Sequence, residues 1–133
     1  MVADPRAAAR VRLLGDLRRA LRGLVAGAVP NEEVLHNDVQ SCLLSAGFTI
    51  NREVIDGDGR YDLLAEVDGL RVAVEIKVAG SAAALCRQVQ RYLGKVDAVF
   101  VVTTRADHLG TVSRCLGHRL DGTAVDGVVV RAL

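Results

Sequence analysis

The sequence predicts an α/β protein with a mixed central sheet, and three observations lead to this prediction. First, 133 residues of which half are apolar are enough for one domain with its own core. Second, segments with apolar residues at helical spacing alternate with short runs that are typical of strands. Third, two tight turns join three consecutive strands, and a helix then leads into a fourth. The predicted order over residues 31–104 is α-β-β-β-α-β, with an extra helix before it and a helix and a strand after it.

The first predicted helix spans residues 5–27 and is amphipathic and basic. Its apolar residues recur every three or four positions, which predicts one buried stripe. Gly27 and Pro30 are expected to end it. We therefore divide the chain into an N-terminal basic helix, residues 1–30, and a main domain, residues 31–133. The stripe consists of Leu13, Leu14, Leu17, Leu21, Leu24 and Val25.

Asn31 is expected to cap a second helix, because its side chain can accept a hydrogen bond from the backbone of the first turn. Glu32 and Glu33 occupy that turn, where negative charge is favoured, and Gly47 supplies a stop. The apolar set of this helix is Leu35, Val39, Cys42, Leu43 and Ala46.

Three strands are predicted next, at residues 48–55, 61–67 and 71–78. The turns at 56–59 and 68–69 contain Asp-Gly pairs, which favour hairpins, so the three strands form an antiparallel meander. A helix over 82–93 then leads to an entirely apolar strand at 98–103, which the helical crossover makes parallel to its neighbour. A helix over 106–118 and a strand at 125–131 complete the prediction.

Composition narrows the function classes without naming one. No apolar run is long enough to span a bilayer, and the three cysteines show no framework or metal-binding spacing, so a cytoplasmic protein without membrane contacts is expected. Residues 1–30 carry six Arg and two Asp, a net +4, whereas the remainder carries −3. The basic helix is either a phosphate-binding surface or simply a solvated helix face.

Charged residues interrupt two of the predicted strands. Asp62 follows Arg60 and Tyr61, and thirteen residues after Asp62 comes Glu75-Ile76-Lys77 inside an apolar run. Side chains two residues apart share a face of a strand, so Glu75 and Lys77 point the same way, and a paired strand through Asp62 adds a third charge. Buried charges need partners, and these three either pair with one another or hold a metal ion.

This arrangement resembles the PD-(D/E)xK nuclease superfamily, although Tyr61 stands where the family often has Pro. The resemblance rests on the spacing of Asp62, Glu75 and Lys77 together with the order of elements over residues 31–104. It implies a restriction-endonuclease-like core and metal-dependent hydrolysis of phosphodiester bonds. Asp62, Glu75 and the Ile76 carbonyl would bind Mg²⁺, with Mn²⁺ as a substitute, and Lys77 would act on the attacking water.

Two helices offer further site residues. On the helix that begins after Asn31, either Glu32 or His36 is a catalytic candidate; the alternatives are a first-turn carboxylate that stabilises the helix and a surface histidine. Gln88 and Tyr92 resemble the Gln-x-x-x-Tyr motif of RecB-like nucleases, where Gln88 would orient water or phosphate and Tyr92 would contact the DNA backbone. Arg87 and Arg91 are nearby phosphate-binding candidates. Glu53 is either another metal ligand or an outward-facing charge.

The function expected from these residues is that of a Mg²⁺-dependent DNA endonuclease or exonuclease. Archaeal Holliday junction resolvases share the small size and a helix that ends in Gly47-Phe48, whereas Gln88 and Tyr92 favour the RecB-like branch. A homodimer is expected, because one active site cuts one strand. The DNA-binding candidates on the first helix are Arg18, Arg19 and Arg22. The alternative is a catalytically silent subunit that keeps the fold and binds DNA or protein within a larger complex.

Overall fold

The computed structural model describes residues 5–26, 31–56, 59–116 and 123–132. Within these ranges the chain forms four helices and seven strands. The helices are α1 (Pro5–Leu21), α2 (Glu32–Ser45), α3 (Ala82–Tyr92) and α4 (Ala106–Leu116). The strands are β1 (Val25–Ala26), β2 (Thr49–Asp56), β3 (Gly59–Val67), β4 (Leu70–Lys77), β5 (Ala98–Thr103), β6 (Ala124–Val129) and β7 (Arg131–Ala132).

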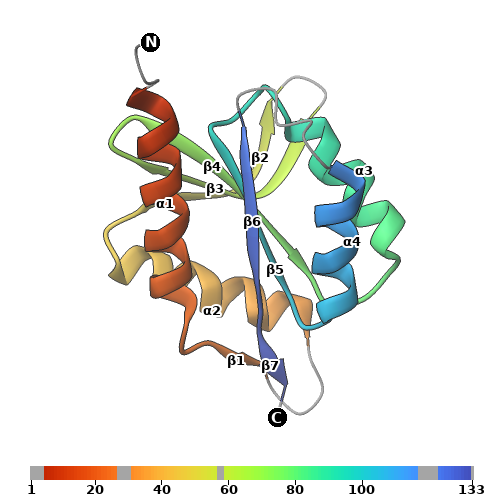
Figure 1. Cartoon of the computed structure of the whole chain (residues 1–133). Helices are drawn as coiled ribbons and strands as arrows, with labels where there is room; N and C mark the ends of the chain where they lie inside the picture. The colour runs from red at the N-terminus through yellow and green to blue at the C-terminus, as the bar shows by residue number, and fades with distance from the viewer. Residues whose placement is uncertain (1–4, 27–30, 57–58, 117–122, 133) are drawn as a thin grey trace.

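The described residues build one five-stranded mixed sheet, in the order β2-β3-β4-β5-β6, and a separate two-stranded pair (Figure 1). Strands β2, β3 and β4 are antiparallel to one another, as the two tight turns predict. Strands β4, β5 and β6 are parallel, because each connection between them passes through a helix. The α/β class, the meander and the parallel crossover are therefore confirmed.

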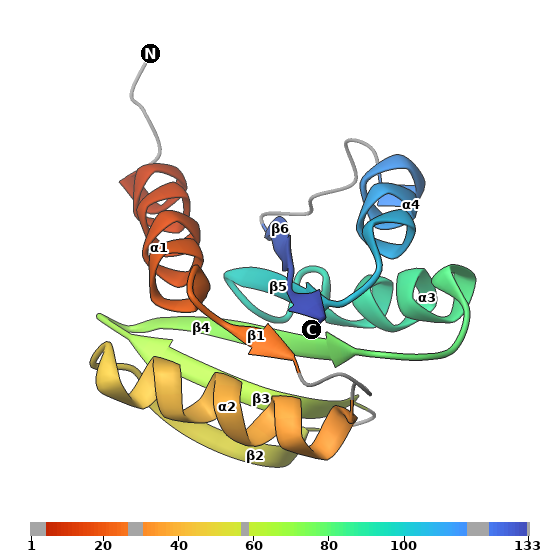
Figure 2. The same cartoon turned by 90° about the horizontal axis from the view of Figure 1, so that it is seen from below.

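Helices cover both faces of this sheet (Figure 2). The α1–α2 face buries Val72, Val74 and Ile76 of β4 against leucines of α1 and α2. The α3–α4 face buries Ala73 of the same strand among side chains of α3, β5 and α4. Alternation along β4 separates these two sets, and it also assigns Glu75, two residues after Ala73, to the α3–α4 face.

The expected helix ends are confirmed where the sequence carries a capping residue. The side chain of Asn31 accepts a hydrogen bond from the Val34 backbone at 3.2 Å, and α2 begins directly after it. Ser81 does the same for α3, accepting from the Ala84 backbone at 3.1 Å. Gly47 has a φ of +95°, a conformation that glycine adopts without strain, and the chain leaves α2 there.

Two predicted boundaries are wrong, and one long-range pairing explains both. The first helix ends at Leu21 and not at residue 27, because residues 25–26 form β1 beside β7. The last strand divides into β6 and β7 at Val130, whose backbone N–H still reaches the Thr103 carbonyl at 2.7 Å. After Val130 the chain leaves β5, and β7 pairs in parallel with β1, joining residues that are more than a hundred positions apart.

The N-terminal segment shares its core with the main domain. Leu13, Leu17 and Leu21 of α1 are buried in the same cluster as residues of α2 and the sheet. The apolar stripe of α1 thus packs on its own sheet. No helix in the described ranges has the length and apolar character needed to cross a membrane.

Candidate active site

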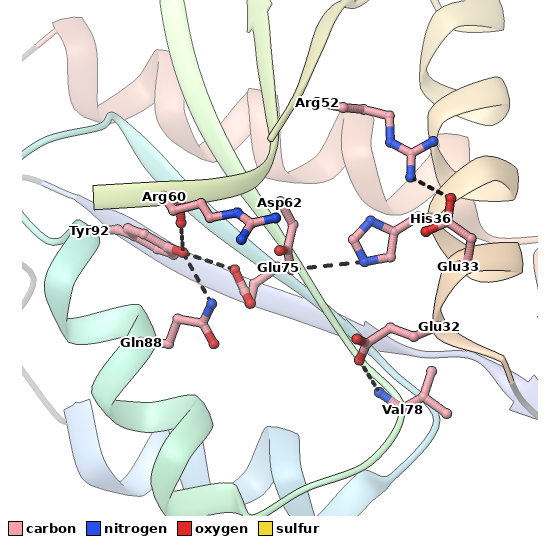
Figure 3. A network of polar contacts seen from close by, with 10 residues as sticks. All are labelled: Glu32, Glu33, His36, Arg52, Arg60, Asp62, Glu75, Val78, Gln88 and Tyr92. Atoms are coloured by element: carbon pink, nitrogen blue, oxygen red, sulfur yellow. Dashed lines mark hydrogen bonds and ion pairs between the residues drawn. The ribbon is translucent and has the colours of Figure 1, made fainter. Parts of the chain in front are cut away.

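The site lies where strands β3 and β4 separate. Their last pair in the described register is Leu63 with Val74, and the preceding pair, Leu64 with Ala73, is buried on the α3–α4 face. Asp62 comes two residues before Leu64 on β3, and Glu75 comes two residues after Ala73 on the antiparallel β4. Alternation therefore brings both carboxylates to that same face. The two carboxylates lie close enough for the charge of Asp62 to act on Glu75 (Figure 3). The sequence-based expectation that Asp62 and Glu75 meet is therefore matched by the geometry.

Glu75 is 2 % exposed and belongs to a polar network with α3 (Figure 3). The hydroxyl of Tyr92 has a single hydrogen, which is shared between the Arg60 carbonyl oxygen at 2.7 Å and Glu75 Oε2 at 3.1 Å. Gln88 Nε2 approaches the same hydroxyl oxygen at 3.4 Å. The ring of Tyr92 packs against that of Tyr61, with centroids 4.8 Å apart. Tyr92 thus contacts Glu75 directly, and Gln88 contacts Tyr92.

The closeness of the two carboxylates changes the acidity of Glu75. Burial, the charge of Asp62 and the hydrogen bond with Asp62 raise the pKa of Glu75 from 4.5 to about 9. The hydroxyl of Tyr92 and the charge of Lys77 act in the opposite direction. Burial, followed by the charge of Glu75, raises the pKa of Tyr92 as well, so that its hydroxyl stays a donor near neutral pH.

Lys77 ends β4 and is partly buried. Its aliphatic end lies against the backbone of Gly80, because a methyl group added at Gly80 would lie 2.9 Å from Lys77 Cε and 3.2 Å from Nζ. Its charge contributes to the electrostatics of Glu75. Lys77 therefore belongs to the same site as Asp62 and Glu75.

Helix α2 reaches the site from the other side of the strand ends, and its two candidates take different positions. His36 Nε2 lies 4.0 Å from Asp62 Oδ2. Glu32 Oε1 accepts from the Val78 backbone N–H at 3.2 Å, directly after Lys77. Glu33 is largely exposed and pairs with Arg52 at 3.1 Å. His36 is thus the closer of the two candidates to the carboxylates, and Glu32 holds the chain at the end of β4. The side chain of Glu53 lies outside the described part of the structure.

A cleft of about 360 Å³ opens beside the carboxylate pair. It is lined by Arg60, Asp62, Gln88, Arg91 and Tyr92. Arg60 was not among the residues expected in the site, although it precedes Asp62 by two and therefore falls on the same face of the strand by alternation. Arg87 lies exposed on α3, one turn before Arg91. The cleft thus combines an acidic group with two arginines.

Helix α1, which carries Arg18 and Arg19 and is followed by Arg22, lies on the opposite face of the sheet from α3 (Figure 2). Arg18 pairs with Asp126, and Arg19 pairs with Asp16. Arg22 is exposed near the end of α1. The structure does not place these three side chains beside the carboxylates.

The donor set suits a hard divalent cation. Two carboxylates in contact repel each other unless a proton or a cation lies between them, and Mg²⁺ is commonly held by one or two carboxylates with water. The Ile76 side chain packs on the α1–α2 face, so only its backbone can contribute. Among the side chains that the structure describes, no group of three or more His, Cys, Asp and Glu is arranged to hold a metal ion. Asp62 and Glu75 supply two carboxylates, the number with which proteins commonly hold Mg²⁺ when water completes the coordination.

Comparisons of the chain with protein-family models, with curated proteins and with solved structures gave no match.

Proposed function

We propose that this protein is a Mg²⁺-dependent nuclease that hydrolyses phosphodiester bonds in DNA. The observation that carries the proposal is the closeness of Asp62 and Glu75 at the point where β3 and β4 separate, with Lys77 on the same strand end. The buried Glu75 beside the partly exposed Asp62 has no packing advantage, since a buried carboxyl group destabilises a fold unless it is compensated.

In this proposal Asp62 and Glu75 hold the cation, with the Ile76 carbonyl as a third oxygen. When bound, Mg²⁺ supplies a Lewis acid that lowers the pKa of water and stabilises charge on phosphate. The chain supplies the positions. The Tyr92 hydroxyl and the Arg60 carbonyl fix the orientation of the Glu75 carboxyl group, and Tyr61 packs against the Tyr92 ring.

Lys77 would hold or accept the proton of the attacking water, or offset charge on the phosphate, from its place at the end of β4. His36 would act through Asp62, which it approaches at 4.0 Å. Glu32 would keep the end of β4 in place through the Val78 backbone. Gln88 would orient Tyr92 and, at the cleft, water or phosphate.

The DNA is proposed to lie over the α3 side of the site. Arg60 and Arg91 line the cleft next to Asp62, and Arg87 extends this positive surface along α3. Guanidinium groups match the geometry of phosphate oxygens. A contact between the DNA backbone and Tyr92 would have to come through the cleft, because Tyr92 is otherwise buried.

The finer fold assignment also belongs to this proposal. A restriction-endonuclease-like core is supported by the α-β-β-β-α-β order and by a sheet whose first three strands are antiparallel and whose next pair is parallel. The acidic pair at the separating ends of the second and third of these strands agrees with the site of PD-(D/E)xK nucleases. The proposal also includes a cytoplasmic location and a homodimer. Light scattering would measure the mass of the assembly and so test for the dimer.

The proposal is tested by incubating the protein with supercoiled, linear, single-stranded and branched DNA in the presence of Mg²⁺ or Mn²⁺. Asp62→Asn, Glu75→Gln and Lys77→Ala should each lower the cleavage rate by roughly 100-fold or more. Glu66→Gln is the matched control, because Glu66 lies exposed on the same strand as Asp62. Equal cleavage by the wild type and all variants would identify a contaminant.

A binding measurement separates the nuclease from the alternative of a catalytically silent subunit. In the wild type, Mg²⁺ or Mn²⁺ should raise the thermal midpoint, since a ligand that binds only the folded state stabilises it, and Asp62→Asn should remove this rise. A protein that shows neither cleavage of any substrate nor a cation-dependent midpoint would be the silent subunit.

A further inference from the structure

The loop between β4 and α3 covers the end of the Lys77 side chain. Gly80 has a φ of +93°, and the space where a side chain would stand is filled by Lys77 Cε and Nζ. The loop is held at its start by Glu32, which accepts from the Val78 backbone at 3.2 Å. The position of the ammonium group therefore depends on where the backbone of Gly80 lies.

His108 holds the other end of this loop. Lys77 is paired with Thr103 in the parallel register, and the chain turns after Thr103 into α4, so the first turn of α4 stands beside the end of β4. His108 lies in that turn and is 2 % exposed. Its Nε2 is 3.1 Å from the Gly80 carbonyl oxygen. Because a carbonyl oxygen only accepts, Nε2 carries the hydrogen and donates it.

The other ring nitrogen makes this histidine a poor choice for packing alone. His108 Nδ1 is buried and has no hydrogen-bond partner among the described residues. Burying a polar atom without a partner destabilises a protein, and an apolar side chain of similar size would avoid that cost. The bond to Gly80 is thus the contact that a leucine at this position would not provide.

We propose that His108 is a positioning residue for Lys77, acting through the Gly80 carbonyl. Helix α4 and helix α2 then clamp the loop from two sides, His108 at Gly80 and Glu32 at Val78. The clamp fixes the ammonium group relative to the carboxylate pair. That this position serves hydrolysis rests on the proposed function; the clamp itself does not.

The chain provides an internal standard for testing the clamp, because Lys77 and Lys95 are its only two lysines. Lys95 is exposed, whereas Lys77 is partly buried under Gly80. The wild type is treated briefly with an acylating reagent at one pH, and the ratio of Lys77 to Lys95 labelling is measured by mass spectrometry. The ratio should be well below one.

Leucine and glutamine are similar in size, but only glutamine can donate a hydrogen bond to the Gly80 carbonyl. His108→Leu removes the donor and should raise the Lys77 to Lys95 ratio towards one. His108→Gln can place its amide nitrogen near the position of Nε2 and should return the ratio to the wild-type value. His108→Asn, whose amide is too short to reach Gly80, replaces His108→Leu if the leucine variant does not fold. Gly80→Ala should raise the ratio without altering His108, because its methyl group displaces the Lys77 side chain.

Kinetics provide the second measurement. If the wild type cleaves DNA, His108→Leu should lower kcat by roughly 10- to 100-fold with little change in KM, because a displacement of about 1 Å in a reacting group has effects of this size. His108→Gln should recover most of the loss.

The proposal is overturned if the labelling ratio of His108→Leu, or of His108→Asn where the leucine variant does not fold, equals that of the wild type. A glutamine variant that labels like the leucine variant would overturn it too. A wild type that cleaves no DNA would contradict the proposed function, while the labelling ratios would still decide whether His108 positions Lys77.

Discussion

The two faces of the central sheet are built by the same strands but bury different kinds of side chain. The α1–α2 face is filled by apolar groups, such as Leu17 and Leu21 of α1 against Val74 and Ile76 of β4. The α3–α4 face buries Glu75 beside the hydroxyl of Tyr92, and His108 of α4 is buried against the Gly80 carbonyl. Side chains that need partners are thus concentrated on one face, and the other face carries most of the apolar core. The comparison shows that strand alternation places apolar side chains of β4 on one face and its buried carboxyl group on the other.

Removing apolar volume from the α1–α2 face should have the largest effect on stability. Leu17 is fully buried, and Leu17→Ala should lower the free energy of unfolding by about 2–5 kcal/mol through lost burial and a cavity. Urea denaturation measures this. Val11→Ala is the control on the same helix, because Val11 is 68 % exposed, and its effect should stay within about 0.5 kcal/mol. Similar effects of the two variants would mean that α1 does not contribute its stripe to the core.

Removing a single oxygen from the α3–α4 face should have a smaller effect. Tyr92→Phe leaves the Arg60 carbonyl and Glu75 without their donor, and about 1–3 kcal/mol of unfolding free energy should be lost. The same urea experiment applies, with Gln90→Ala as an exposed control on α3. An unchanged midpoint for Tyr92→Phe would show that the hydroxyl network adds nothing to the stability of this face.

The raised pKa of Glu75 on the α3–α4 face should make the free energy of unfolding depend on pH. In the folded chain Glu75 keeps its proton up to about pH 9, whereas in the unfolded chain it loses it near pH 4.5. Between these values the folded state binds the extra proton, so the contribution of Glu75 to stability falls as the pH rises. Glu75→Gln cannot ionise and should become progressively more stable than the wild type from pH 5 to 9.

Urea midpoints of the wild type and Glu75→Gln over this pH range measure the effect, with Glu66→Gln as the exposed control. Parallel curves would show that the pKa of Glu75 is not raised. Mg²⁺ should reduce the decline in the wild type, because the cation favours the ionised pair.

The arginines on the two faces provide the finest comparison. Alanine at Arg87 and Arg91 should weaken DNA binding and lower the salt slope by up to about 0.9 for each lost phosphate contact. Alanine at Arg18, Arg19 and Arg22 should change the slope less, because Arg18 and Arg19 already pair with aspartates. Fluorescence anisotropy at several salt concentrations would decide. A larger change for the α1 variant would place the DNA on the α1–α2 face.

Much of the fold follows from local signals. The apolar run at 98–103 forms a strand with the expected bounds, and Asn31 begins its helix as its capping chemistry predicts. The end of α1 could not be predicted in this way. Val25 continues the apolar stripe of the helix, yet it forms a strand because β7 arrives beside it from the other end of the chain.

The residues of the site also fall into two groups, those that local patterns predict and those that only the packing reveals. Asp62, Glu75 and Lys77 could be placed together, because the strand period of two and two tight turns are written in neighbouring residues. Arg60 could have been added by the same alternation. The roles of Tyr92 and His108 could not, because each depends on a helix packing against strands from elsewhere in the chain.

By itself, the sequence determined the order of the elements, the antiparallel meander and the face on which the residues of β4 lie, since these depend on periodicity and turn chemistry within a few residues. Only the tertiary structure decided that β3 and β4 separate at the carboxylates, that Tyr92 donates to Glu75 and that His108 reaches Gly80. Such contacts depend on how helices and strands pack across the sheet, and packing is set by the whole core and not by any one segment.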